Sequence, residues 1–210
     1  MYRADSSIIG QPAGSPAQAA AFICSRPHGA YTEWDIRAVI VPAYFRLAAT
    51  VGVDPILALA QMIHETGNLT SFWSQRPQRN PAGIGVTGRA QPHQPEDCTG
   101  WCFNDQRQQW EMGVSFASWE HDAIPAQLGR LLAYALRPGE GNAAQEALIA
   151  RALRYRPFPD AFRGTARTIK ALGRAHNPLG ARGAGWASPG TRYGEALASV
   201  ANRIVVLPVV

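Results

Sequence analysis

One stretch of the chain carries the local signals of a buried helix with defined ends. Asp54 followed by Pro55 marks a helix start, because aspartate caps the free N–H groups of the first turn and proline at the first helical position has no N–H to lose. Gly67 marks the end, since glycine is the usual residue just beyond a helix C-terminus. The sequence therefore predicts a largely buried helix over residues 55–66. Apolar residues recur in it at the spacing of one helical face, at Ile56, Leu59, Ala60 and Ile63.

This helix places one carboxyl group, that of Glu65, in its last turn. The negative end of the helix dipole and partial burial both disfavour a charge there, so we expect the pKa of Glu65 to be raised. A carboxylic acid that stays protonated near neutral pH is what glycoside hydrolysis needs to protonate a leaving oxygen. A glutamate at a helix end is also commonly just solvated, so Glu65 gains weight only from its context.

The composition fits one medium-sized globular domain. The chain has 210 residues, 46% of them hydrophobic, and no apolar run reaches the roughly 18–20 residues of a membrane-spanning helix. The formal net charge of +5 is carried almost wholly by arginine and would suit nucleic acid, anionic membranes or acidic polymers. We interpret most arginines as solvated helix faces and expect no nucleic-acid partner, because they neither cluster nor alternate with aromatic residues. These scattered arginines include Arg76, Arg79, Arg130, Arg151, Arg154 and Arg167.

The placement of cysteine and histidine argues against a metal site or another cofactor. Cys98 and Cys102 lie in a loop-like segment, where a small disulfide would form in an oxidising compartment. A zinc site would need four ligands, and only His93 lies close by. The helix carries His64, but position 68 is Asn68 rather than the second histidine of a helical zinc motif. No dinucleotide-binding or acyl-transfer motif is complete.

The chain divides into an N-terminal segment and one helix-rich domain. Residues 1–30 are rich in Ser, Gly, Pro and Ala and are interpreted as an arm or linker, and residues 31–210 as the domain. The chain does not begin with a basic patch and an apolar core, so no signal peptide is evident. Residues 68–112 predict loops and a small β-hairpin, and residues 114–119 a strand-like piece. Further helices are predicted over residues 32–50 (with a kink at Pro42), 122–136, 142–154, 161–172 and 191–204.

Several weak motifs occur in one order along the chain. Glu65-Thr66-Gly67 is followed by the glycine-rich turn Asn80–Val86, then by Phe116-Ala117-Ser118-Trp119, and near the C-terminus by Trp186-Ala187-Ser188 and Tyr193-Gly194. Together, over about residues 33–205, they resemble the glucosaminidase family of peptidoglycan hydrolases, which includes bacterial autolysins and flagellar wall-cutting enzymes. The chain departs from the family pattern where Thr66 replaces serine, Ala82 an aromatic residue, Val86 lysine, and Trp119 and Trp186 tyrosine.

The resemblance implies a fold and an activity. The fold is α+β but mostly α: a lysozyme-like helical domain with a small β-hairpin lobe over the active-site cleft. The activity is that of an endo-β-N-acetylglucosaminidase, which cleaves the β-1,4 glycosidic bond after N-acetylglucosamine in bacterial cell walls, with Glu65 as general acid. The residues expected to bind substrate are Asn80 and Gly83 of the turn and the aromatic residues Trp119, Trp186 and Tyr193. Other aromatic faces suited to sugar rings are Trp73, Trp101 and Trp110.

The resemblance also implies a second carboxylate, on the β lobe between the glycine-rich turn and Phe116. We favour Glu111, which directly precedes the strand-like piece; Glu96, Asp97 and Asp105 are the alternatives. Carboxyl groups ~5–5.5 Å apart would indicate a retaining enzyme, and ~6.5–9.5 Å an inverting one. A route through the sugar's own N-acetyl group would need no protein nucleophile, and all three mechanisms stay open.

The same resemblance implies a partner and a place of action. Peptidoglycan glycan strands would be the substrate, and the net positive charge would favour anionic wall polymers, an attraction that falls with salt. The protein would act outside the cell or in the cell wall. Two other functions stay open: a lytic transglycosylase, which uses a lone glutamate but closes an anhydro ring, and a catalytically silent wall-binding module.

Overall fold

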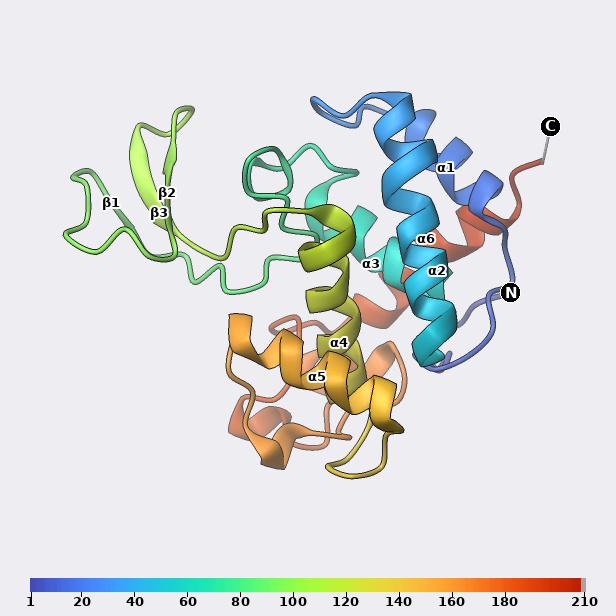
Figure 1. Ribbon diagram of the computed structural model, residues 1–210. Helices are drawn as coiled ribbons and strands as arrows, with labels where there is room; N and C mark the ends of the chain where they lie inside the picture. Colours follow the sequence, from blue (N-terminus) through green and yellow to red (C-terminus); the bar gives the residue numbers. More distant parts are fainter. Residues whose placement is uncertain (209–210) are drawn as a thin grey trace.

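The computed structural model describes residues 1–208 of the 210-residue chain and shows a helical body with a small β lobe that projects from one side (Figure 1). The lobe is a three-stranded antiparallel sheet of β1 (Ala90–Gln91), β2 (Trp101–Asn104) and β3 (Gln109–Met112). The predicted fold class, α+β but mostly α with a small β lobe, is confirmed. The helices are α1 (Pro16–Cys24), α2 (Val41–Val51), α3 (Pro55–Thr66), α4 (Ile124–Ala135), α5 (Ala143–Tyr155) and α6 (Tyr193–Val205).

The predicted central helix, α3, is confirmed at both ends. The Asp54 carboxylate accepts hydrogen bonds from the N–H groups of Ile56 and Leu57, and Gly67 takes the left-handed conformation at φ +59°. The helix packs against α6 near the middle of the body (Figure 1). Every residue of α3 is buried except His64 and Glu65, so the helix carries the Glu65 side chain to the edge of the core.

Residues 1–30 are part of the packed body rather than a loosely packed arm. α1 begins with a capping box in which Ser15 and Gln18 bond each other's main chain, and Phe22 on its inner face is buried in the core. The Tyr2 hydroxyl donates to Asp54 Oδ2 at 2.8 Å, which ties the start of the chain to the cap of α3. The composition misleads here because the alanines of α1 form an apolar helix face as well as a linker-like sequence.

The helix predicted over residues 32–50 is confirmed, with a change of pitch. Thr32 and Asp35 cap each other's main chain, and the segment Asp35–Ile40 is π-helical before it continues into α2. Pro42 is the second residue of α2, and Gly52 ends this helix with φ +73°. The helices predicted over residues 122–136, 142–154 and 191–204 correspond to α4, α5 and α6.

The helix predicted over residues 161–172 is wrong. The segment holds only two short 3₁₀ turns, Asp160–Phe162 and Lys170–Leu172. Between them the chain turns at Gly164, where φ is +72°, and the N–H of Ala166 donates to the carbonyl of Tyr134 at 2.8 Å. The N–H groups of Ile169 and Lys170 donate to the carbonyls of Ser6 and Ala4, so the segment bonds the end of α4 and the start of the chain instead of forming a helix of its own.

The strand predicted over residues 114–119 is also wrong. The N–H of Val114 donates to the carbonyl of Ile84, and that of Phe116 to the carbonyl of Gln78, so the segment is held by two loops and has no partner strand. Trp119 then begins a short π-helix, Trp119–Ala123, that leads into α4. An alternating apolar pattern predicts a strand only where another strand is available to pair with it.

The β lobe contains the predicted hairpin and one further strand. β2 and β3 form the hairpin, and β1 pairs on the other side of β3, with Ala90 opposite Glu111, giving the order β1-β3-β2. Cys98 and Cys102 are both free thiols in this lobe, and Cys102 Sγ lies 3.0 Å from Ser115 Oγ. The lobe is thus held by its strand pairing and loop contacts.

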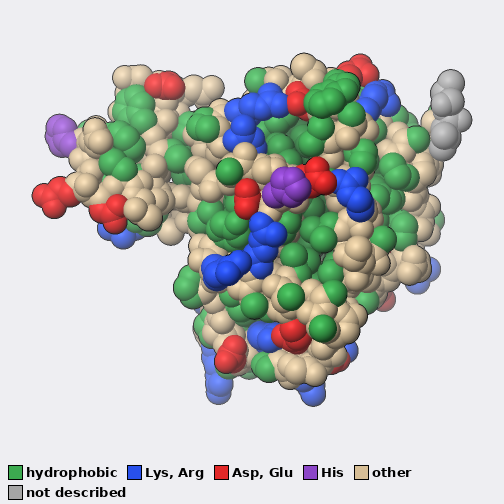
Figure 2. Space-filling model, in the orientation of Figure 1, with side chains coloured by type: hydrophobic (Ala, Val, Ile, Leu, Met, Phe, Trp, Pro, Cys, Tyr) green, Lys and Arg blue, Asp and Glu red, His purple; other side chains and the backbone are tan. Residues whose placement is uncertain are grey.

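Basic side chains do not gather into one patch on the face of the molecule that Figure 2 draws. Figure 2 shows them on one face of the helical body, interspersed with acidic and apolar side chains. Within residues 1–208, seven arginines form ion pairs with Asp or Glu. Arg130, in contrast, is buried. None of the helices described is both long enough and apolar enough to span a bilayer.

Candidate active site

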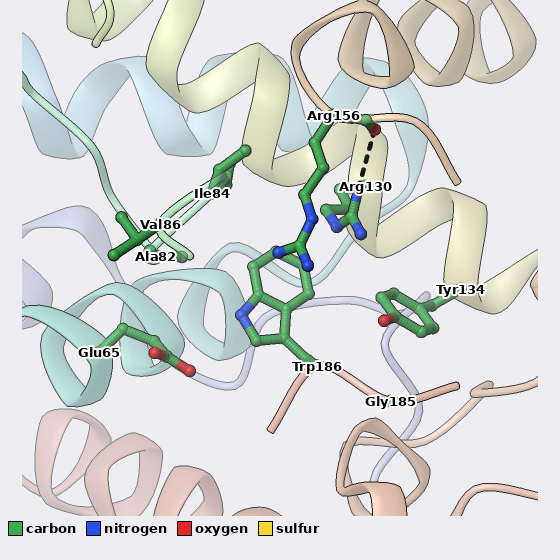
Figure 3. Close-up of a pocket in the computed structure, with 10 residues that line it drawn as sticks. Glu65, Ala82, Ile84, Val86, Arg130, Tyr134, Arg156, Gly185 and Trp186 are labelled. Atoms are coloured by element: carbon green, nitrogen blue, oxygen red, sulfur yellow. Dashed lines mark hydrogen bonds between the residues drawn. The ribbon is translucent and has the colours of Figure 1, made fainter. Parts of the chain in front are cut away.

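Glu65 reaches from the end of α3 into a cavity of about 360 Å³. The side chain is half-buried, and its carboxyl group points toward Trp186 (Figure 3). One wall of the cavity is the glycine-rich turn that follows α3, and the other comes from α4, the end of α5 and the segment before α6. The cavity therefore lies where four separate parts of the chain meet at one acid.

Tyr193, the first residue of α6, holds the carboxyl group of Glu65. Its hydroxyl donates a short hydrogen bond to Glu65 Oε1 and accepts one from Gln61 Nε2 at 3.0 Å. Burial raises the pKa of Glu65 above its ordinary value, and the bond from Tyr193, which favours the carboxylate, offsets part of that rise. The predicted direction of the shift is confirmed, with burial as its main cause.

The Tyr193 hydroxyl ends a row of buried polar side chains that crosses the helical core. Gln61 lies one turn before Glu65 on α3 and accepts through Oε1 from Gln127 Nε2 of α4 at 2.9 Å. Tyr44 of α2 donates in turn to Gln127 Oε1. We call Tyr44, Gln127, Gln61 and Tyr193 the polar chain. Because each amide is oriented by the next partner, the Tyr193 hydroxyl proton is directed at Glu65.

The glycine-rich turn contains two of the predicted site residues, and only one of them lines the cavity. Asn80 is fully buried: its Nδ2 donates to the carbonyls of Ile84 and Val114 at 2.8 and 2.9 Å, and its Oδ1 accepts from the N–H of Ile84 at 2.9 Å. Asn80 therefore shapes the turn and does not line the cavity. Gly83 does line it, with φ +62° and no atom within 4 Å of where a Cβ would lie. The turn requires this left-handed conformation, which glycine adopts without strain.

The two predicted tryptophans have different surroundings. Trp186 is half-buried and lines the cavity opposite Glu65 (Figure 3). Trp119 is only 5% exposed, packs edge-on against Tyr31 and donates its Nε1–H to the Tyr31 hydroxyl at 3.0 Å. The expectation that Trp119 binds substrate is not supported, because the π-helix that it begins turns the indole into the core.

Glu111 lies on β3 beside a second cavity, of about 400 Å³, in the β lobe. Its Oε1 accepts hydrogen bonds from Gln109 Nε2, Arg107 Nη1 and Asn104 Nδ2 at 3.0, 3.1 and 3.2 Å. Burial alone would raise the pKa of Glu111, but these bonds and the charge of Arg107 outweigh burial and lower it. The two glutamates line different cavities, which share Val86 as a lining residue.

The other acidic candidates of the β lobe line neither of these two cavities. Glu96, Asp97 and Asp105 are exposed, and Asp105 borders a third hollow, together with Trp101 and Trp110. Trp73 lines the Glu111 cavity. Within residues 1–208, no three His, Cys, Asp or Glu side chains are grouped so as to hold a metal ion.

The sequence did not indicate three polar residues that line the cavity: Arg130, Tyr134 and Arg156. Arg130 had been assigned to a solvated helix face, yet every residue of α4 is buried. The signal that could have found two of them is the spacing of polar residues in this apolar helix, Gln127, Arg130 and Tyr134, which repeats every three or four positions. On a buried helix such a polar stripe must face other polar groups or a cavity.

Comparisons with known proteins return one structural likeness. No protein-family model matches the chain, and no curated protein does. The crystal structure of autolysin E from S. aureus, in complex with the muropeptide NAM-L-Ala-D-iGlu, aligns with 97% of this chain and 72% of that chain, at 12% sequence identity and a TM-score of 0.47. At that identity and TM-score it assigns no residue a role in this chain.

Proposed function

We propose that this protein is a peptidoglycan hydrolase that cleaves the β-1,4 glycosidic bond after N-acetylglucosamine, with Glu65 as the general acid. The observation that carries the proposal is the state of Glu65: a half-buried carboxyl group with a raised pKa, directed into a cavity by a tyrosine. The resemblance of the motifs around it to wall glucosaminidases supplies the substrate class. The lysozyme-like arrangement of a helical body and a β lobe fits that substrate.

In the proposed reaction, the protonated Glu65 gives its proton to the glycosidic oxygen as the bond from that oxygen to C1 breaks. The sugar left behind passes through an oxocarbenium-like state, and water adds at C1 to give a new reducing end. Tyr193 keeps the carboxyl group aimed at the cavity and stabilises the carboxylate that forms once the proton has left. Entry of a sugar would remove more water from Glu65 and raise its pKa further.

We assign the second acid of the proposed reaction to Glu111. Its hydrogen bonds to three donors and its lowered pKa keep it ionised, the form that accepts a proton from an attacking water. Val86 lines both the Glu111 cavity and the Glu65 cavity, and the proposal places one glycan strand across the two. Glu65 and Glu111 then divide the work as acid and base because their surroundings move their pKa values in opposite directions.

In the proposed complex, the indole of Trp186 binds a sugar ring. Its half-buried indole lines the Glu65 cavity, and an indole face suits the apolar side of a pyranose ring. The net charge of +5 would add attraction to anionic wall polymers. Both features fit a protein that acts at the cell wall.

The test is digestion of purified peptidoglycan by the wild type and by Glu65→Gln, with products reduced by borohydride and identified by mass spectrometry. We expect reducing-end N-acetylglucosaminitol from the wild type and a rate about 10²–10⁴-fold lower from the variant. Glu195→Gln, an exposed glutamate on α6, is the matched control and should digest at the wild-type rate.

The products separate this proposal from its rivals. Anhydromuramyl ends in place of reduced N-acetylglucosamine would replace hydrolysis by transglycosylation. If the wild type and both variants sediment with the wall and release nothing, the protein is a binding module and not an enzyme.

A further inference from the structure

The Glu65 cavity holds a buried cation that has no carboxylate partner. Arg130 of α4 is 7% exposed, and none of the ion pairs within residues 1–208 includes it. Burial lowers the pKa of Arg130 to about 10; the charge of Arg156 adds to this fall, and the neighbouring Tyr134 hydroxyl offsets part of it, so the guanidinium is still charged at neutral pH. Buried arginines are ordinarily paired with an acid, because an unpaired charge in a protein interior is costly.

The surroundings hold this guanidinium in place without neutralising it. Arg130 Nη1 donates to the main-chain carbonyl of Arg156 at 3.1 Å. The ring centroids of Phe158, Trp186 and Tyr134 lie 5.1, 5.9 and 6.0 Å from its Cζ. These aromatic contacts position a cation, but they leave its charge available to a partner in the cavity.

Arg156 brings a second cation to the same wall. It follows the last residue of α5, its side chain is exposed, and no ion pair within residues 1–208 includes it. Figure 3 shows the guanidinium groups of Arg130 and Arg156 on one side of the cavity and Glu65 on the other, with the indole of Trp186 between them. Among residues 1–208, Glu65 is the only acidic residue that lines this cavity, and its carboxyl group is hydrogen-bonded to Tyr193.

We infer that Arg130 and Arg156 form a subsite for a carboxylate of the substrate, on the far side of Trp186 from Glu65. The planar forks of guanidinium groups match the two oxygens of a carboxylate, and a partly buried pair binds it more strongly than a surface lysine would. The inference rests on the proposed peptidoglycan substrate. In such a strand, the carboxylate is that of the lactyl group of muramic acid or that of the peptide attached to it.

Binding of small glycans to the Glu65→Gln protein tests the inference, because it needs no turnover. The probes for calorimetry are the disaccharide N-acetylglucosaminyl-N-acetylmuramic acid, its methyl ester, and N,N'-diacetylchitobiose, which lacks the lactyl group. A disaccharide–dipeptide and its fully amidated counterpart form the second arm. We expect an acid to bind about 10-fold or more tighter than its neutral counterpart, the usual scale of a charged hydrogen bond.

Arginine variants in the same background locate the effect. Arg130→Gln should lower the affinity for the acid by about 10–100-fold and leave the affinity for the neutral glycan unchanged. Arg156→Gln, at an exposed position that tolerates substitution, should do the same to a smaller extent and covers the case in which Arg130→Gln does not fold. The control is Arg154→Gln, an exposed arginine of α5 outside the cavity.

The outcomes are distinct. Preference for the free disaccharide acid assigns the subsite to the lactyl carboxylate, and preference confined to the dipeptide arm assigns it to the peptide. Equal binding of each acid and its neutral counterpart, unchanged in Arg156→Gln, overturns the inference even if the wild type digests the wall. Acid-selective binding without digestion would instead uphold the subsite and overturn the proposed hydrolysis.

Discussion

The helical body and the β lobe each hold one glutamate beside a cavity, and they treat its charge in opposite ways. In the body, Glu65 receives one hydrogen bond, from Tyr193, and burial keeps its pKa raised. In the lobe, Glu111 is bonded by three side chains, one of them a cation, and its pKa is lowered. In the proposed reaction these two states would supply a proton donor and a proton acceptor, and the difference between them comes from their neighbours.

The largest effect is expected from removal of the carboxylate of the β lobe. Glu111→Gln should lower the rate of wall digestion by about 10²–10⁴-fold while the protein still sediments with peptidoglycan, since the base would be lost and the acid kept. The matched control is Glu96→Gln, an exposed glutamate of the same lobe, which should digest normally. Full activity of Glu111→Gln would mean that the carboxylate only stabilises the lobe and that the reaction needs no base from it.

Loss of a polar side chain should lower the free energy of unfolding more in the helical body than in the β lobe. Gln127→Leu breaks the polar chain and leaves the Tyr44 hydroxyl and Gln61 Oε1 without partners, at about 1–3 kcal/mol for each. Gln109→Leu removes one of three donors to Glu111 at a half-buried site and should cost less than about 1 kcal/mol. Urea unfolding measures both. Equal losses would contradict the view that the polar chain is a core element.

The helices α3 and α4 show which features of the site the sequence could predict and which it could not. The ends of α3 were predictable because Asp54, Pro55 and Gly67 act within a few residues of where they stand. The burial of Arg130 was not, because a polar stripe on a helix is normally solvated, and only the packing of α4 inside the body prevents that.

The β side of the site shows the same limit. Glu65 could be predicted as an acid from its own helix, whereas the state of Glu111 depends on Asn104, Arg107 and Gln109 meeting across a hairpin. Asn80 and Trp119 stand in the motifs that predicted substrate contacts, but their side chains turn inward. A motif gives the position of a residue along the chain, and tertiary packing decides which way its side chain points.

The two glutamates should change the pH dependence of the free energy of unfolding in opposite directions. A carboxyl group with a raised pKa in the folded state loses its contribution as the pH rises through that value, so wild type should lose stability relative to Glu65→Gln above about pH 4.5. A lowered pKa has the opposite effect. The stability supplied by Glu111 is present above its ordinary value, near 4.5, and is lost as the pH falls, so Glu111→Gln should be most destabilising at neutral pH.

The measurement is urea unfolding of the wild type and both variants across the acidic-to-neutral range. The stability difference from wild type should change with pH in opposite directions for Glu65→Gln and Glu111→Gln. Slopes of the same sign would show that the two carboxyl groups share one environment. Glu195→Gln, exposed on α6, is the reference for the general effect of removing a charge.

The smallest expected effect is that of adding one methyl group to either cavity. Gly83 lines the Glu65 cavity at φ +62° and Gly88 the Glu111 cavity at φ +75°, and at neither does an added Cβ meet an atom within 4 Å. Alanine at either position should therefore cost the same, about 1–2 kcal/mol of left-handed strain, in urea unfolding. Their effects on digestion should differ: a methyl group at Gly83 enters the space beside the acid and should raise KM severalfold, whereas Gly88→Ala should leave KM near the wild-type value. If the larger rise follows Gly88→Ala instead, the reacting sugar lies in the lobe, and Glu111 rather than Glu65 is the residue next to the bond that breaks.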